Sequence, residues 1–289
     1  MQQLSLPGEL VKKSNAITRA QWQPESIWEP RIVALVASKV RTDDEDFFTY
    51  KIPVTELTGV SEQNLRGNQY REIAKSIEHL GKAIIRIQGN KPRNFRQYNI
   101  FSMCGYEDGY LIARFDPDLK PHFLGLQEKF TEYSLMQFLL LPSTYSQRLF
   151  EILKSWDDKP EVEISVFDLH EMLNTPESMR KDFRQFRTRV LEKAHKDITS
   201  KTDLYFEWEA IKKGRSFIKV RFIFARKRAL PVAEKKEKNE LQKQSRKNTA
   251  IFKAAVACFK EHGPGCTGGH QKTEICEACK RLASKEKSS

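Results

Sequence analysis

The chain has 289 residues, of which 39% are hydrophobic and 30% charged, and its formal net charge is +12. This length suffices for two domains with their own cores, and a strongly basic chain favours a polyanion as its partner. No apolar run approaches membrane-spanning length and the N-terminus lacks a signal-peptide core, so we expect no membrane partner and a cytoplasmic location.

After a polar segment at residues 1–26, the first half of the chain alternates helical and extended patterns. Helical stretches carry apolar residues three or four positions apart, whereas the extended stretches are short and rich in aromatic and β-branched residues. The sequence Glu107-Asp108-Gly109 between two extended stretches is typical of a β-hairpin turn. In chain order we expect a helix at residues 31–40, a strand at 47–52, a small helix at 54–59, a long helix at 63–81, a strand at 83–87 and a hairpin formed by residues 98–103 and 110–115.

The same order of elements recurs in the second half of the chain. The string at residues 31–36 is matched by the string at 148–153, and that at 52–57 is matched at 164–169. Each half therefore reads helix, short strand, short helix, long helix and two-stranded wing. This order is that of a winged helix, a helix-turn-helix variant whose last helix enters the major groove of DNA. A shared order over about a hundred residues indicates internal duplication.

Residues 179–201, the long helix of the second half, carry the strongest functional signal. Apolar residues at helical spacing form one stripe, which is suited to burial, and basic residues crowd the other face. Arg and Gln are the side chains that make bidentate contacts with purine edges in a major groove. A solvated amphipathic helix is the alternative, although such helices usually mix charges more evenly. The predicted DNA contacts on this helix are Arg180, Lys181, Arg184, Gln185, Arg187, Thr188 and Arg189.

Three further basic groups are weaker candidates for DNA contact. The long helix of the first half also contains Glu72 and Glu78, so we expect it to contact phosphates or a second copy of the chain. A basic loop before the first hairpin and the tip of the second wing suit phosphate contact, and a plain charged surface remains the alternative for each. The residues are Arg66, Asn68, Gln69, Arg71 and Lys75 on the helix, Arg93 and Arg96 in the loop, and Lys212, Lys213 and Arg215 on the wing.

Four of the five cysteines lie close together near the C-terminus, with His262 and His270 between them. A pair of cysteines two residues apart is typical of a tetrahedral zinc site, and free thiols are the alternative. We expect no required cofactor other than a possible structural zinc ion in this tail. The candidate ligands are Cys258, Cys266, Cys276 and Cys279.

The sequence contains no pattern typical of catalysis. The glycines at residues 263–269 are followed by His270 where a nucleotide-binding loop requires lysine. No pair of histidines has the spacing with which a rolling-circle nicking enzyme holds its metal. We therefore predict a protein that binds DNA and is not an enzyme.

Taken together, the order of these stretches resembles the Rep_3 superfamily of plasmid replication initiators, which bind iterons. The resemblance implies an α+β fold of two tandem winged-helix domains related by internal duplication, with a basic C-terminal tail. Domain limits follow as an N-terminal segment at 1–26, domains at 27–129 and 130–230, and the tail at 231–289. The resemblance runs from about residue 10 to 227 and is carried by residues 11–16, 31–40, 130–134, 145–151 and 183–198.

What this resemblance implies for function is specific. Members bind iteron repeats in double-stranded DNA at a replication origin as monomers, and as homodimers they repress their own gene through inverted repeats. The first domain is then expected to dimerise and contact DNA, and the second to be the main DNA-binding domain. The host DnaA initiator, the DnaB helicase and chaperones are the implied partners in a plasmid-bearing bacterium. The alternative is a winged-helix transcriptional regulator with a zinc-bearing interaction tail.

Overall fold

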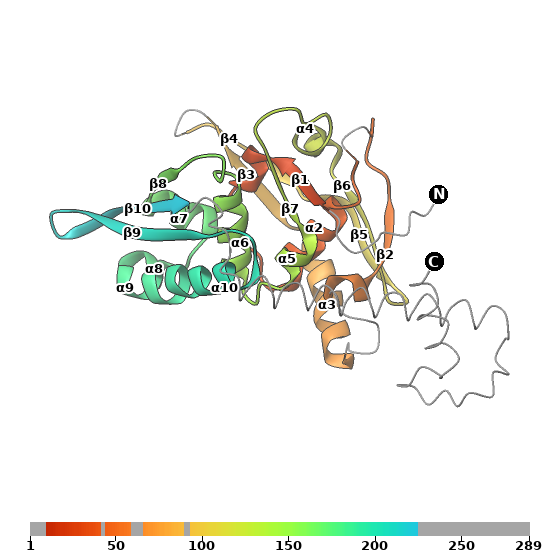
Figure 1. Ribbon diagram of the computed structural model, residues 1–289. Coiled ribbons are helices and arrows are strands. Elements are labelled where there is room, and N and C mark those ends of the chain that lie inside the picture. Colours follow the sequence, from red (N-terminus) through yellow and green to blue (C-terminus); the bar gives the residue numbers. More distant parts are fainter. Residues whose placement is uncertain (1–9, 42–43, 59–65, 90–92, 225–289) are drawn as a thin grey trace, which may run out of the picture. The chain divides into compact units, whose positions relative to one another are not determined.

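The described residues form two winged helices, each of which combines a helix-turn-helix with a three-stranded antiparallel sheet (Figure 1). The computed structural model describes residues 10–41, 44–58, 66–89 and 93–224. Within these ranges, no helix is both long and apolar enough to cross a membrane. The cysteine cluster proposed to bind zinc lies outside the described residues.

The first winged helix forms a sheet in the order β2-β6-β5. Its hairpin turns at Asp108 and Gly109, both with positive φ (47° and 83°), as the Asp-Gly sequence predicts for a two-residue turn that matches the strand twist. The elements are α2 (Trp28–Ala37), β2 (Tyr50–Pro53), the 3-10 helix η1 (Val54–Thr58), α3 (Gly67–Leu80), β5 (Phe101–Glu107) and β6 (Tyr110–Phe115).

The second winged helix forms a sheet in the order β8-β10-β9, which repeats the topology of the first. The duplication predicted from the order of elements is thus seen in the strand pairing. The elements are α6 (Thr144–Lys154), β8 (Glu161–Ser165), α7 (Val166–Leu173), α8 (Glu177–Lys181), α9 (Phe183–Phe186), the π-helical turn η4 (Arg187–Glu192), α10 (Lys193–Lys201), β9 (Phe206–Lys213) and β10 (Ser216–Phe224).

An additional hairpin, β3 (Ile84–Gln88) with β4 (Phe95–Asn99), stands between α3 and β5 and has no counterpart in the second domain. The sequence-based prediction of a single strand at residues 98–103 differs from this structure, in which β4 ends at Asn99 and β5 begins at Phe101. Ile100 between them is buried, so the chain changes direction around an apolar anchor. Periodicity over so short a stretch does not reveal the break.

A two-stranded sheet joins the beginning of the chain to its middle. Strand β1 (Leu10–Ser14) pairs antiparallel with β7 (Phe130–Ser134), and Val11 lies opposite Tyr133, both buried. Part of the predicted N-terminal segment at residues 1–26 thus pairs with the start of the predicted second domain at residue 130. The short helices α1 (Asn15–Thr18), η3 (Pro117–Leu119), α4 (Lys120–Phe123) and α5 (Leu135–Leu139) complete this region.

The core is continuous through both winged helices and is built on aromatic residues. Phe115 stacks on Phe123 with ring centroids 4.5 Å apart and on Phe101 at 4.9 Å. In the second domain, Phe186 and Val190 of the predicted apolar stripe are fully buried. Each such side chain stabilises the fold by about 1.5–3 kcal/mol through loss of apolar surface to water. Residues 10–224 accordingly belong to one compact unit.

Candidate nucleic-acid interface

The helix predicted at residues 179–201 is interrupted at Asp182, whose backbone is extended (φ −130°, ψ 95°). The Asp182 carboxylate accepts a hydrogen bond from the Arg184 N–H at 2.9 Å, so it caps a new helix that begins at Phe183. Arg180 and Lys181 consequently lie in α8, before the recognition helix. The recognition helix itself consists of α9, η4 and α10.

The outward face of this recognition helix is basic and largely free of internal partners. The Arg184 and Arg189 side chains are exposed and make no hydrogen bond or ion pair within the part of the chain that the structure describes. The Nε atom of Arg187 donates to Glu192 at 2.8 Å, but this exposed pair is weak. The same face, including residues that the sequence reasoning did not select, carries Arg184, Arg187, Thr188, Arg189, Lys193 and Lys196.

Three of the predicted contact residues on this segment are placed differently. The Arg180 guanidinium donates to the carbonyl oxygens of Thr175 at 2.9 Å and His170 at 3.3 Å, and it pairs with Glu171. Its donors are therefore used within the protein, where they close the turn between α7 and α8. Gln185 is half-buried, and exposed Lys181 pairs with Glu177.

The wing of the second domain is attached to the beginning of the recognition helix. Phe217 of β10 stacks on Phe183 with ring centroids 4.1 Å apart and planes at 17°. The turn of the wing is at Gly214, whose φ of 63° favours glycine. Lys212, Lys213 and Arg215 are exposed beside this turn, as phosphate contacts require.

The recognition helix of the first domain, α3, has a mixed surface. Gln69 accepts a hydrogen bond from the Arg66 N–H at 3.0 Å, so this predicted contact residue caps the helix. Asn68 donates to Glu72 at 3.1 Å and accepts from Arg71 at 3.4 Å. Arg66, Asn68, Arg71 and Lys75 are all exposed.

The remaining predicted residues, Arg93 and Arg96, belong to the β3–β4 hairpin and are exposed. In Figure 1, α3 and the α8–α10 segment both lie along the lower edge of the view, whereas this hairpin lies along the upper edge. The structure thus places the two recognition helices toward one edge of this view and the β3–β4 hairpin toward the other. Sequence spacing could not separate these groups, because the hairpin follows α3 directly in the chain.

The described residues include one group of side chains with the composition of a metal site, namely Glu25, Glu29 and His79. His79 uses both ring nitrogens for carboxylates, Nδ1 for Glu29 and Nε2 for Glu25, each at 3.1 Å. These polar contacts fasten α3 to the start of α2. Cys104, the cysteine that lies outside the C-terminal cluster, is partly buried, and burial raises the pKa of its thiol to about 12.

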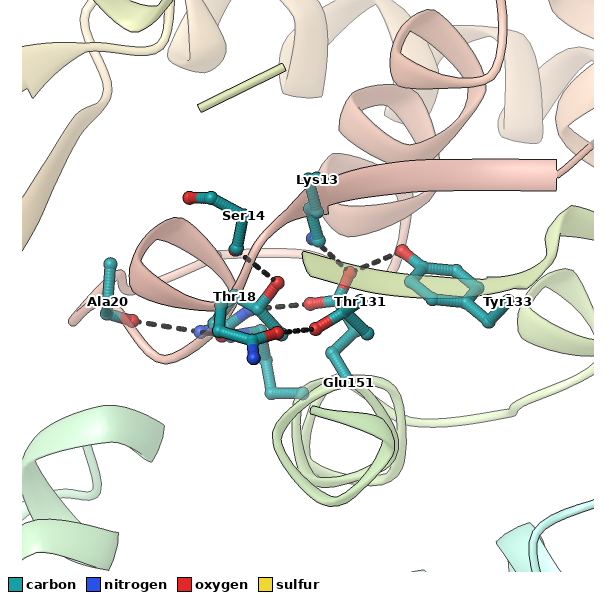
Figure 2. Close-up of polar contacts among 9 residues, drawn as sticks. Lys13, Ser14, Thr18, Ala20, Thr131, Tyr133 and Glu151 are labelled. Carbon is teal, nitrogen blue, oxygen red and sulfur yellow. Dashed lines mark hydrogen bonds and ion pairs between the residues drawn. The ribbon is translucent and has the colours of Figure 1, made fainter. Parts of the chain in front are cut away.

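A buried ionic network that sequence reasoning missed joins β1, β7 and α6 (Figure 2). The Glu151 carboxylate accepts from Lys13 and from the Tyr133 hydroxyl, each at 2.5 Å. Arg148 donates to the other oxygen of Glu151 at 2.5 Å and to the carbonyl oxygen of Ala20 at 2.9 Å. Burial alone would raise the pKa of Glu151, but the positive charges of Lys13 and Arg148 bring it below its usual value. The sequence offered one signal of this network, which is that Lys13 stands at an inward-facing position of a strand and therefore needs a buried partner.

Comparison with known proteins agrees with this architecture. Residues 10–154 match the family model described as initiator replication protein, WH1, and residues 165–224 match initiator Rep protein, WH2. The first match begins at β1 and ends with α6, so it includes the paired strands β1 and β7.

Similar individual proteins include an Escherichia coli protein and an initiator of known structure. The PI protein of Escherichia coli is 29% identical over 187 residues, which span 58% of this chain and 59% of that protein. The crystal structure of the Pi initiator protein in complex with iteron DNA has the same fold, with a TM-score of 0.60 at 20% identity, covering 78% of this chain and 100% of the other. With both winged-helix models matched in order over residues 10–224, the chain belongs to the family of initiator replication proteins.

Proposed function

We propose that this protein initiates plasmid replication by binding iterons, which are directly repeated sites in duplex DNA at an origin. The observation that carries the proposal is the recognition helix of the second domain. Its apolar stripe is held in the core, while Arg184, Arg187 and Arg189 face outward without strong internal partners. The likeness to PI protein, and to an initiator crystallised on iteron DNA, supports the choice of ligand.

In this proposal the second domain reads the sequence. The helix enters the major groove, where an arginine can donate two hydrogen bonds to the O6 and N7 atoms of guanine. Thr188 can contact a base or a thymine methyl group. The wing lysines and Arg215 then contact the flanking phosphates, and the stacked Phe183 and Phe217 hold wing and helix in a fixed relation.

The first domain contributes a second, weaker contact. Its helix α3 presents Arg66, Arg71 and Lys75, but Glu72 lies among them and repels phosphate. We therefore assign it phosphate contacts and a limited part of base recognition. Two recognition helices on one edge of the molecule can enter successive major grooves when they are about one helical turn apart.

Several consequences of this function go beyond DNA contact. Many copies bound to repeats would distort adjacent AT-rich DNA and recruit the DnaA initiator and the DnaB helicase, with chaperones adjusting the balance between monomer and homodimer. Homodimers would bind inverted repeats and repress the gene. The comparisons do not favour the alternative of a transcriptional regulator, which predicts a single palindrome at a promoter in place of direct repeats.

The experiment is a footprint of the full-length protein on the DNA that flanks its own gene, at several salt concentrations. Protection of directly repeated sites of about two helical turns, beside an AT-rich segment, supports initiation. A single protected palindrome at a promoter supports the regulator. Absence of protection with retained non-specific binding would contradict sequence-specific recognition altogether.

A further inference from the structure

The segment Thr18 to Gln23, which we call the clasp, runs between the first domain and helices α6 and α7 of the second. Arg19 donates from Nε to the Ser155 hydroxyl at 2.8 Å and from Nη2 to the Ser155 carbonyl at 2.6 Å. Its guanidinium lies over the Trp156 ring, 3.3 Å from the ring centroid. Three contacts thus fasten one clasp residue to the C-terminal end of α6.

The first end of the clasp is fixed by the buried ionic network. The Nη2 atom of Arg148 donates to the carbonyl oxygens of Thr18 at 3.2 Å and Ala20 at 2.9 Å. Its Nη1 atom donates to the Glu151 carboxylate. Figure 2 shows Lys13 and Tyr133 converging on the Glu151 carboxylate beside Thr18 and Ala20. Movement of this end would leave charges buried without partners, so it is the rigid anchor.

The other end of the clasp touches both domains through one residue. The Gln21 backbone forms a bridge with Arg86 of β3, with N–O distances of 2.8 Å and 2.9 Å. Its side chain donates to Glu171 of α7 at 3.2 Å. Two residues further on, Gln23 accepts from Asn174 at 2.6 Å. Gln21 therefore links a strand of the first domain to a helix of the second.

Glu171 continues this link to the recognition helix. One carboxylate oxygen accepts from Gln21 and the other pairs with Arg180. Arg180 also closes the α7–α8 turn and stands two residues before Asp182, the cap of the recognition helix. An unbroken series of contacts thus runs from β3 through the clasp to the beginning of α9.

We propose that Gln21, Glu171 and Arg180 are positioning residues that set the distance and rotation of the second recognition helix relative to the first domain. By this means the protein measures the spacing between the two parts of its DNA site. The inference rests on the proposed function. Inserting one base pair displaces one contact by about 3.4 Å and a tenth of a turn, which a rigid pair of domains cannot follow. Two domains that are less rigidly joined can adjust to this displacement, but they bind DNA of the natural spacing less tightly.

The test uses the full-length protein and two DNA duplexes, the footprinted repeat and the same repeat with one base pair inserted between its two protected halves. The variant is Gln21→Ala with Gln23→Ala, which removes the clasp contacts to α7 and leaves the buried network intact. The matched control is Gln97→Ala with Gln127→Ala, because both glutamines are exposed and have no side-chain partner among the residues that the structure describes.

We expect the clasp variant to bind the natural repeat about 3- to 10-fold more weakly than the wild type does. The inserted base pair should reduce the affinity of the variant by a factor at least about threefold smaller than the factor by which it reduces the affinity of the wild type. The control should match the wild type on both duplexes. An unchanged ratio between the two duplexes in the clasp variant overturns the inference. If the wild type itself protects no repeat, the proposed function fails instead.

Arg180 provides a second measurement. Arg180→Ala should weaken binding while leaving the slope of log affinity against log salt unchanged, because its donors face the protein and not phosphate. Arg184→Ala, on the exposed face, is the comparison. A slope that falls by about one in Arg180→Ala would show a phosphate contact and overturn the positioning role of this residue.

Discussion

Phe183 and Phe217 stack with their ring centroids 4.1 Å apart, which joins the first turn of the recognition helix to the wing. The contact brings together two elements that are more than thirty residues apart in the chain. It fixes the wing relative to the helix, and these are the two parts of the proposed DNA interface in the second domain.

Replacing Phe217 by Ala should detach the wing from the helix. We expect the free energy of unfolding to fall by roughly 1–3 kcal/mol and DNA affinity to fall with it, since apolar burial and aromatic stacking are both lost. Chemical denaturation and a binding titration give the two values. Phe167→Ala is the control, because Phe167 is 69% exposed and has no ring partner among the described residues. Equal effects of the two substitutions would contradict the stacking argument.

Replacing Arg184 or Arg189 by Ala should relax sequence preference and cost about 1–3 kcal/mol of binding free energy each, if the guanidinium reaches a base edge. Arg187→Ala should cost less, because its pairing with Glu192 must be broken before DNA contact. Competition against mismatched sites measures the preference. A uniform loss on every sequence would make these residues phosphate contacts. Arg96→Ala, on the hairpin at the other edge, should change neither affinity nor preference.

The Glu151 carboxylate predicts a dependence of stability on acidity. Its pKa lies below the ordinary value of 4.5, so its contribution is complete above that value and is lost as the pH falls through the lower folded-state pKa. Glu151→Gln should cost about 3–5 kcal/mol at pH 7, because Lys13 and Arg148 lose their buried counter-charge. Urea denaturation at neutral and acidic pH should show this difference shrinking as the pH falls below the ordinary carboxyl pKa of 4.5.

Glu163→Gln is the control for that experiment. Glu163 is also paired with two basic residues, Lys219 and Arg221, but this group lies at the surface, with the three side chains 31–46% exposed. We expect the Glu163→Gln substitution to change the free energy of unfolding at neutral pH very little, because water screens exposed ion pairs. A Glu163 effect as large as that of Glu151 would show that burial is not the cause.

The pairing of β1 with β7 predicts the behaviour of a fragment that begins at residue 130. Such a fragment keeps β7, Arg148 and Glu151 but loses β1 and Lys13, so an unpaired strand and a buried carboxylate with one of its two cationic partners would remain. We expect it to unfold at a lower temperature than the full chain and to associate through the free strand. Circular dichroism and solution mass provide the measurement. A monomeric fragment of undiminished stability would contradict the structural role given to β1.

The cysteine tail predicts bound metal. If Cys276 and Cys279 hold zinc with Cys266 and one further ligand such as Cys258, the purified protein should contain about one equivalent. Elemental analysis and thiol titration under native conditions measure this. Four freely reacting thiols and no zinc would rule the site out.

The sequence by itself determined what depends on local spacing. The inward stripe with Phe186, Val190 and Ala194 could be predicted because an amphipathic helix repeats its buried positions every three or four residues. The Asp108-Gly109 turn could be predicted because few residues adopt its positive φ angles. The order of the elements also depends on local spacing, and because that order occurs twice, it indicated two winged helices.

Only the tertiary structure decided which distant groups meet. Nothing in residues 10–14 specifies that their partner strand begins at residue 130, because many strands share the same alternation. Arg180 has the composition of a DNA contact, yet the turn before α8 directs its guanidinium to Glu171 and two carbonyl oxygens. Hydrogen bonds and ion pairs of this kind depend on which side chains lie close together in the folded protein. The spacing of residues along the sequence predicts that proximity only within one helix or one turn.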